Sequence, residues 1–176
     1  ERMNGLCQGD SLAEALADSR RRSLAIYGHL DLAGIQVPCI PLVNPPLWEL
    51  AHIAWFQEYW CQRFDAALDR VIQPSSLEDA DALFDSRSVP HDSRWTLPYP
   101  PVDEIRAYME DSLDGTLAAL ATSDESERYF FALALLHEDM HGEALLMTLQ
   151  TMSWALPGSV ALSALRGAGA STRDVR

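Results

Sequence analysis

The chain has 176 residues, 48% of them hydrophobic and 22% charged, as in a single globular domain with a substantial core. Its net charge of −13, with arginine as the only basic residue besides histidine, argues against a nucleic-acid partner, because no basic stripe can neutralise phosphates. Apolar runs are too short to span a bilayer and no signal peptide opens the chain, so we expect a cytoplasmic protein without membrane contact.

The first predicted helix runs from about Asp10 or Ser11 to Leu32, where apolar residues recur at spacings of three and four. Ser11 and Glu14 are spaced as a capping box at its start. The three arginines at positions 20–22 predict a solvated helix face.

The second predicted helix begins at Asn44-Pro45-Pro46 and continues to about Leu68. Asparagine is a good N-cap. Proline is tolerated at the first helical position, because an N–H there has no hydrogen-bond partner within the helix. This segment is apolar nearly all round, so we expect it to be central in the fold.

A long loop is predicted over residues 70–100, which contain four prolines and no sustained period. A short helix near residues 76–84 interrupts it. The third helix starts at Pro101 and carries apolar residues at helical spacing as far as Leu120.

The fourth predicted helix begins near Thr122 or Ser123, with Thr122 and Glu125 as a capping box, and runs to about Trp154. No strand pattern is evident. We therefore predict an all-α, up-and-down four-helix bundle over residues 10–155, with a long loop between helices two and three. Residues 1–9 are expected to be a disordered start and residues 156–176 a linker or truncated end.

The most informative motif is His137-Glu-Asp-Met-His141 in the fourth helix. Residues four apart project from one helix face, so both imidazoles can reach one metal ion. Alanines at 134 and 144 leave space on that face. HExxH occurs both in zinc proteases and in helical-bundle metalloenzymes.

His52 is the strongest candidate for a third ligand, because a polar ring in the middle of an apolar helix needs a partner. His29 near a helix end and His91 in the loop are expected to be exposed. Three imidazoles suit a metal site in the core of a bundle, with coordination positions left open for other ligands. Zinc, iron(II), nickel and copper all accept three imidazole ligands.

A zinc protease needs a further ligand downstream of HExxH, and after Glu143 the chain offers only Asp174 and no histidine. The sequence therefore disfavours a protease. A non-catalytic helical bundle, with the histidines packed without metal, remains an alternative.

Other residues near the expected site receive weaker predictions. Glu138 can orient an imidazole, whereas Glu143 lies about 200° from His141 around the helix and is a candidate second-sphere residue, interhelical partner or solvated charge. The tryptophan-rich second helix, with Trp55, and the loop residues Arg87 and Arg94 can form a pocket wall with an anion clamp.

The three cysteines, Cys7, Cys39 and Cys61, are widely spaced and form no CxxC pair. They indicate neither a disulfide framework nor a thiolate zinc site, and we expect buried free thiols.

Three segments, PPLWELAHIAWFQEYW, LFDSRSVPHDSRW and LLHEDMHGEALLM, resemble the N-terminal DinB-like domain of the ergothioneine-biosynthesis sulfoxide synthases. Within that group the chain is most similar to the selenoneine synthases. The resemblance covers residues 10–155.

The resemblance implies an iron(II) site formed by His52, His137 and His141. It further implies an enzyme that uses dioxygen to join a chalcogen to the imidazole of hercynine. Sulfur members take cysteine or glutamyl-cysteine, and selenium members take a selenosugar. Sulfoxide synthases commonly have a substrate-contacting glutamine where this chain has Met140, so an altered substrate pocket is expected.

Members of this family also carry a C-terminal formylglycine-generating-enzyme-like domain, and nothing after Pro157 resembles it. We therefore expect a fragment whose active site is incomplete on its own. The alternative is a free-standing DinB-like transferase that uses a low-molecular-weight thiol on a divalent metal.

Overall fold

The structure, a computed structural model, describes residues 9–155 apart from positions 29, 33 and 126. The predicted disordered start up to residue 8 and the predicted linker at 156–176 lie outside the described residues, as do Cys7 and His29.

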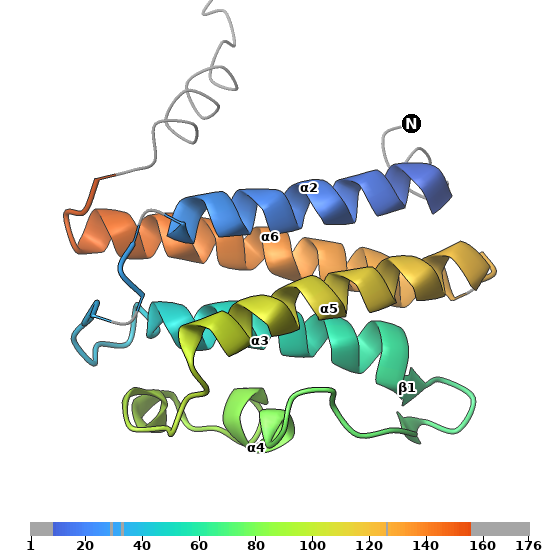
Figure 1. The fold of residues 1–176 in the computed structure, drawn as a ribbon, viewed down its shortest axis with the longest axis horizontal. Helices are drawn as coiled ribbons and strands as arrows, with labels where there is room; N and C mark the ends of the chain where they lie inside the picture. Colours follow the sequence, from blue (N-terminus) through green and yellow to red (C-terminus); the bar gives the residue numbers. More distant parts are fainter. Residues whose placement is uncertain (1–8, 29, 33, 126, 156–176) are drawn as a thin grey trace, which may run out of the picture.

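Four long helices lie side by side and form the bundle (Figure 1): α2 (Gly9–Tyr27), α3 (Pro46–Glu58), α5 (Val102–Thr122) and α6 (Arg128–Thr151). α2 packs on α6, and α3 packs on α5 and α6. The loop between α3 and α5 returns along the bundle, so these two helices run in the same direction and α2 and α6 run opposite to them. The predicted all-α four-helix bundle with a long loop is confirmed, but the predicted up-and-down order is wrong, because the consecutive long helices α3 and α5 run parallel.

The second predicted helix ends earlier than expected. α3 stops at Glu58 and passes into a π-helical turn, η1 (Tyr59–Arg63), so the predicted end near Leu68 is wrong. Two strands of two residues each follow, β1 (Phe64–Asp65) paired antiparallel with β2 (Arg70–Val71). Strands this short carry no alternating pattern, which is why the sequence did not predict them.

The long loop contains two short helices, α4 (Ala80–Phe84) and the 3₁₀-helix η2 (His91–Trp95). It lies along α3 (Figure 1). The indole of Trp48 on α3 donates a hydrogen bond to the carbonyl of Leu83 at 2.9 Å. The loop therefore forms a wall beside the central helix.

Two helix boundaries differ from the predictions. α2 ends at Tyr27 rather than Leu32. α6 begins at Arg128, later than the predicted start near 122, and Glu127 at its N-cap makes no side-chain cap. In the turn before it, the amide of Glu127 donates to the carboxylate of Asp124, and the amide of Asp124 donates to that of Glu127. The capping box predicted at Thr122 is wrong, because Thr122 is the last residue of α5 and its hydroxyl donates to the carbonyl of Ala119.

The core lies between the helices and includes a buried ion pair between Arg20 and Glu138. Arg20 on α2 is 2% exposed, so the predicted solvated run at 20–22 is wrong at this position. Its Nε donates to Glu138 Oε1 at 2.8 Å, and Nη2 to Glu138 Oε2 at 3.1 Å.

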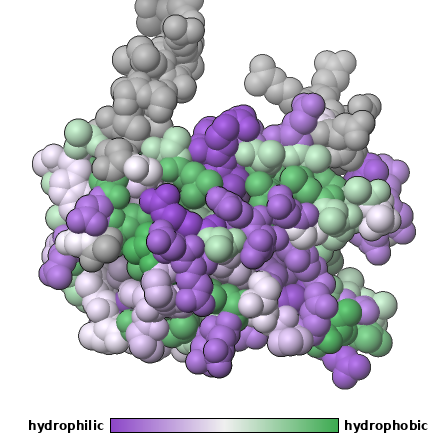
Figure 2. All heavy atoms as spheres, in the orientation of Figure 1, coloured by the Kyte–Doolittle hydropathy of each residue, from purple (hydrophilic) through white to green (hydrophobic). Residues whose placement is uncertain are grey.

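On the surface, hydrophilic and apolar side chains are mixed on the face in Figure 2. None of the described helices has the length and apolar character of a membrane span.

Candidate metal centre

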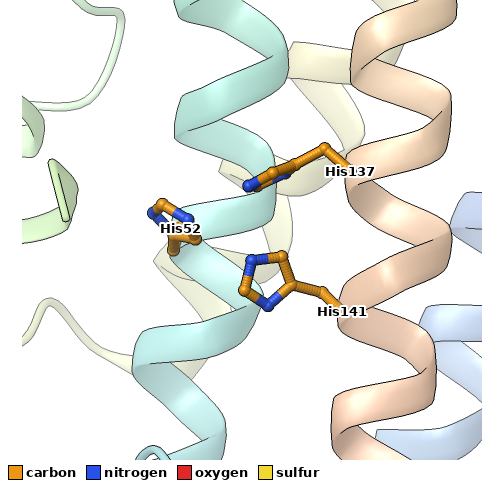
Figure 3. Close-up of side chains that lie close together, drawn as sticks. All are labelled: His52, His137 and His141. Carbon is orange, nitrogen blue, oxygen red and sulfur yellow. The ribbon is translucent and has the colours of Figure 1, made fainter.

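Three histidines meet between α3 and α6 (Figure 3). The ring centroid of His52 lies 5.0 Å from those of His137 and His141, which are 4.5 Å from each other. One potential ligand atom of each lies within 4.8 Å of the others. His52 and His141 are buried. The helical period brings the HExxH pair to one face, and antiparallel packing of α3 on α6 supplies the third ring.

Two of the rings present Nε2 to the space between them. His52 Nδ1 lies 2.7 Å from the carbonyl oxygen of Phe84, and His141 Nδ1 lies 3.1 Å from Glu49 Oε1. Carbonyl and carboxylate oxygens only accept hydrogen bonds, so each Nδ1 carries the hydrogen. Each Nε2 therefore keeps a lone pair, as a metal ligand must.

His137 is fixed by stacking. Its ring lies 3.6 Å, centroid to centroid, from that of Phe56, with only 9° between the planes. Its Nδ1 is buried and has no hydrogen-bond partner in the described part of the chain. A buried polar atom without a partner costs about 1–3 kcal/mol. The group therefore fits a site that binds an ion.

Two of the histidines, His52 and His137, favour their neutral forms. Burial, with a smaller contribution from the neighbouring His141, lowers the pKa of His52 to about 3. Burial likewise lowers the pKa of His137 to about 2, with His141 and His52 adding to it. Neutral imidazole is the form that coordinates a metal ion, so these two rings can bind a metal ion at neutral pH.

Glu49 is a site residue that the sequence analysis missed. Besides His141, its carboxylate accepts hydrogen bonds from the Tyr27 hydroxyl at 3.2 Å and the Asn44 amide at 3.4 Å. Burial and the Glu49 charge raise the pKa of Tyr27, which keeps its proton. The signal in the sequence was an acidic residue in the apolar first half of the helix, three residues before His52.

Glu138, which was predicted to orient an imidazole, does not do so. Glu138 is 100° round the helix from His137, faces α2 and binds Arg20 with both oxygens, which corrects the prediction. Glu143 is exposed, in agreement with the solvated alternative.

The four predicted substrate contacts lie at different places around the centre. Trp55 is 2% exposed and donates to Asp81 Oδ1 at 2.7 Å, with its ring 5.9 Å from that of His52. Arg87 is exposed and lies over the rings of Trp55 and Tyr59. Met140 is 50% exposed on α6.

Arg94 lies on the other side of His52. Its guanidinium is 3.7 Å from the ring centroid of Trp48, which in turn stacks on His52 at 4.7 Å. Its Nη1 donates to Asn44 Oδ1 at 2.8 Å, and Asn44 donates to Glu49. Arg94 therefore belongs to the hydrogen-bonded chain that ends at His141.

The two cysteines in the described residues are free thiols. Cys61 is buried as expected, and burial raises its pKa. Cys39 is exposed, so the prediction of a buried thiol is wrong there.

Comparison with known proteins agrees with the fold. A family model describing the DinB superfamily matches residues 15–149. Similar curated proteins include two named hercynine oxygenase. The one from Mycolicibacterium smegmatis is 35% identical over 142 residues, which is 80% of this chain and 32% of the relative. The one from Mycobacterium tuberculosis is 30% identical over 158 residues, 88% of this chain and 36% of the relative. The chain thus spans about a third of the length of these relatives.

Proposed function

The chain belongs to the DinB superfamily, and we propose that it is the metal-binding domain of an iron(II)- and dioxygen-dependent enzyme that acts on hercynine. The observation that carries the proposal is the meeting of His52, His137 and His141, whose potential ligand atoms lie within 4.8 Å of one another. Iron(II) accepts imidazole nitrogen and leaves open positions in such a shell.

The substrate class rests on the relatives named hercynine oxygenase. We assign to the complete enzyme the formation of a C–Se or C–S bond on the hercynine imidazole, with a selenosugar or a thiol as donor. Bound iron would supply the redox chemistry that couples dioxygen to this oxidation. Met140 in place of glutamine supports a pocket that differs from that of the sulfur enzymes.

The residues of this chain then have separate tasks. The three histidines hold the metal, and Glu49 fixes the ring of His141. Arg87, an exposed guanidinium that lies over Trp55 and Tyr59 and pairs with Asp85 at 2.8 Å, is the candidate partner for the hercynine carboxylate. We further propose that a C-terminal domain completes the pocket and contacts Met140 on the exposed face of α6.

The first test is anaerobic iron(II) loading of the chain followed by metal analysis. We expect stoichiometric iron in the unaltered chain and in Glu143→Gln, an exposed control on α6, and loss of iron in His52→Ala and His137→Ala. Circular dichroism checks that each variant is folded. Absence of iron from the unaltered chain, or full retention in both histidine variants, contradicts the site.

The second test addresses the substrate. Hercynine is titrated calorimetrically into the iron-loaded chain, with histidine, which lacks the three N-methyl groups, as the matched control ligand. We expect binding of hercynine that weakens in Arg87→Ala. An iron-loaded chain that binds neither ligand, but binds a low-molecular-weight thiol, favours the thiol-transferase alternative.

A further inference from the structure

A second group of potential metal ligands lies outside the three-histidine centre, where the segment before α3 meets η2. Cys39, His91 and Asp92 each offer one ligand atom, and these atoms lie within 4.8 Å of one another. Asp92 Oδ1 is 3.8 Å from Cys39 Sγ and 3.0 Å from His91 Nδ1. Ligands about 2.0–2.3 Å from a tetrahedral zinc lie about 3.3–3.8 Å apart, so these separations are close to those of a zinc site.

The orientation of His91 points to a cation. Its Nε2 lies 2.9 Å from the carbonyl oxygen of Val43 and so donates the ring hydrogen there. In the neutral ring, Nδ1 then carries a lone pair that faces the carboxylate of Asp92. A proton on Nδ1, or a metal ion in its place, joins the ring to this carboxylate, and the Cys39 thiol reaches the same carboxylate oxygen.

The two segments that supply these ligands are already tied together on either side of Cys39. The Trp95 indole donates to the carbonyl of Val37 at 2.8 Å, and its ring packs edge-to-face against His91 at 5.0 Å. The His91–Val43 bond closes the other side. The backbone is thus arranged before any ion binds, and a hydrogen bond from the second ring nitrogen is the usual support of a metal-ligating histidine.

We propose that Cys39, His91 and Asp92 form a second metal site, which binds a zinc-type divalent cation through thiolate, imidazole and carboxylate, with water as the fourth ligand. Binding releases the Cys39 thiol proton to solvent and forms the metal–sulfur bond without any change of oxidation state. The mixed sulfur, nitrogen and oxygen donors suit zinc, and a hard cation such as magnesium does not accept the thiolate.

The role of this site is structural. η2 carries both His91 and Arg94, and Arg94 holds Asn44, which donates to Glu49. An ion that joins Cys39 to η2 therefore stiffens the support of the carboxylate that orients His141. The proposal itself does not depend on the function proposed for the three-histidine centre.

Cobalt(II) titration of the full chain tests the site, because a cysteine ligand gives a sulfur-to-cobalt charge-transfer band that a purely histidine site cannot give. We expect this band in the unaltered chain, in Cys7→Ser and in the His52→Ala/His137→Ala double variant. We expect its loss in Cys39→Ser, which changes one exposed atom and leaves the fold intact. A titration without the band, or a band that persists in Cys39→Ser, overturns the proposal.

Alkylation of Cys39, followed by peptide mass spectrometry, gives an independent measurement. Zinc is expected to slow modification of Cys39 in the unaltered chain, but not in His91→Ala or Asp92→Asn. Cys61 is the internal control, since it is buried with or without zinc. Equal alkylation of Cys39 with and without zinc contradicts the site even if the cobalt experiment is positive.

Discussion

His141 on α6 and Glu49 on α3 are joined by a hydrogen bond of 3.1 Å that runs from the imidazole Nδ1 to a carboxylate oxygen. The two residues are 92 positions apart in the chain, and Glu49 is 1% exposed. A buried carboxylate in this position fixes the tautomer of the ring and makes its other nitrogen a stronger ligand.

Replacing Glu49 by glutamine should therefore weaken metal binding while leaving the fold in place. Glutamine keeps the size and an acceptor oxygen but removes the negative charge, and loss of such a partner lowers metal affinity about 10- to 100-fold. Competition with a chelator of known affinity measures the change. Glu143→Gln is the matched control, because Glu143 is exposed on the helix that carries His141. Equal affinity of Glu49→Gln and the unaltered chain would show that Glu49 does not support the site.

A second prediction concerns the buried pair of Arg20 and Glu138, whose side chains are 3% and 1% exposed. Arg20→Met leaves the Glu138 carboxylate buried without a counter-charge, which should cost about 3–5 kcal/mol of unfolding free energy. The double variant Arg20→Met/Glu138→Leu should regain most of that loss, because no unpaired charge remains. Urea unfolding measures all three proteins.

Arg21→Ala is the control for this pair, because Arg21 is exposed and its removal should change the unfolding free energy by less than about 0.5 kcal/mol. A loss in Arg20→Met no greater than in Arg21→Ala would contradict a structural role for the ion pair.

The sequence pattern was sufficient to predict that the three histidines lie close together. The i,i+4 spacing of His137 and His141 determines their common face, and an apolar helix that contains one histidine implies a buried partner. The same reasoning predicted the bundle and the start of α5 after Pro101. These features depend on local period and on residues that act within one helix.

Contacts between distant segments were not predictable in this way. Arg20 and Glu138 are 118 positions apart, and in the sequence Arg20 looks no different from its exposed neighbours at 21 and 22. Glu49 was overlooked for the same reason, because its partner lies on another helix. The end of α3 at a π-turn also escaped prediction, since the apolar pattern continues through Tyr59–Arg63 while the backbone hydrogen bonding changes.

A third prediction follows from Asp81, which binds the buried Arg63 with both oxygens at 2.9 and 2.6 Å. The hydrogen bonds from Arg63 hold the pKa of Asp81 below its ordinary value of 3.8. A carboxyl group whose pKa is lowered by folding stabilises the protein above its unfolded pKa, and that stabilisation disappears as the pH falls through its folded pKa. Asp81→Asn should therefore lower the melting temperature at pH 7, and the difference from the unaltered chain should vanish in acid.

Thermal unfolding across the acidic range measures this effect. Glu78→Gln, at an exposed position in the same loop, should leave the melting temperature nearly unchanged at every pH. A constant difference between Asp81→Asn and the unaltered chain from pH 7 down to pH 2 would mean that packing, and not the charge of Asp81, is responsible.

The last prediction concerns Phe56, whose ring lies 3.6 Å from that of His137 at an angle of 9°. No hydrogen bond within the described residues holds His137 Nδ1, so the stacked ring is what fixes the direction of this imidazole. Phe56→Ala should free the ring to rotate and weaken metal binding, whereas Phe56→Tyr keeps an aromatic face and should bind nearly as well as the unaltered chain. Chelator competition measures the metal affinities. The unfolding free energy shows separately how much Phe56→Ala destabilises the fold. Removal of a fully buried ring costs about 3–5 kcal/mol, and we expect a smaller loss at this half-buried position. If the alanine and tyrosine variants bind metal equally well while both are folded, His137 is oriented by the metal itself and not by Phe56.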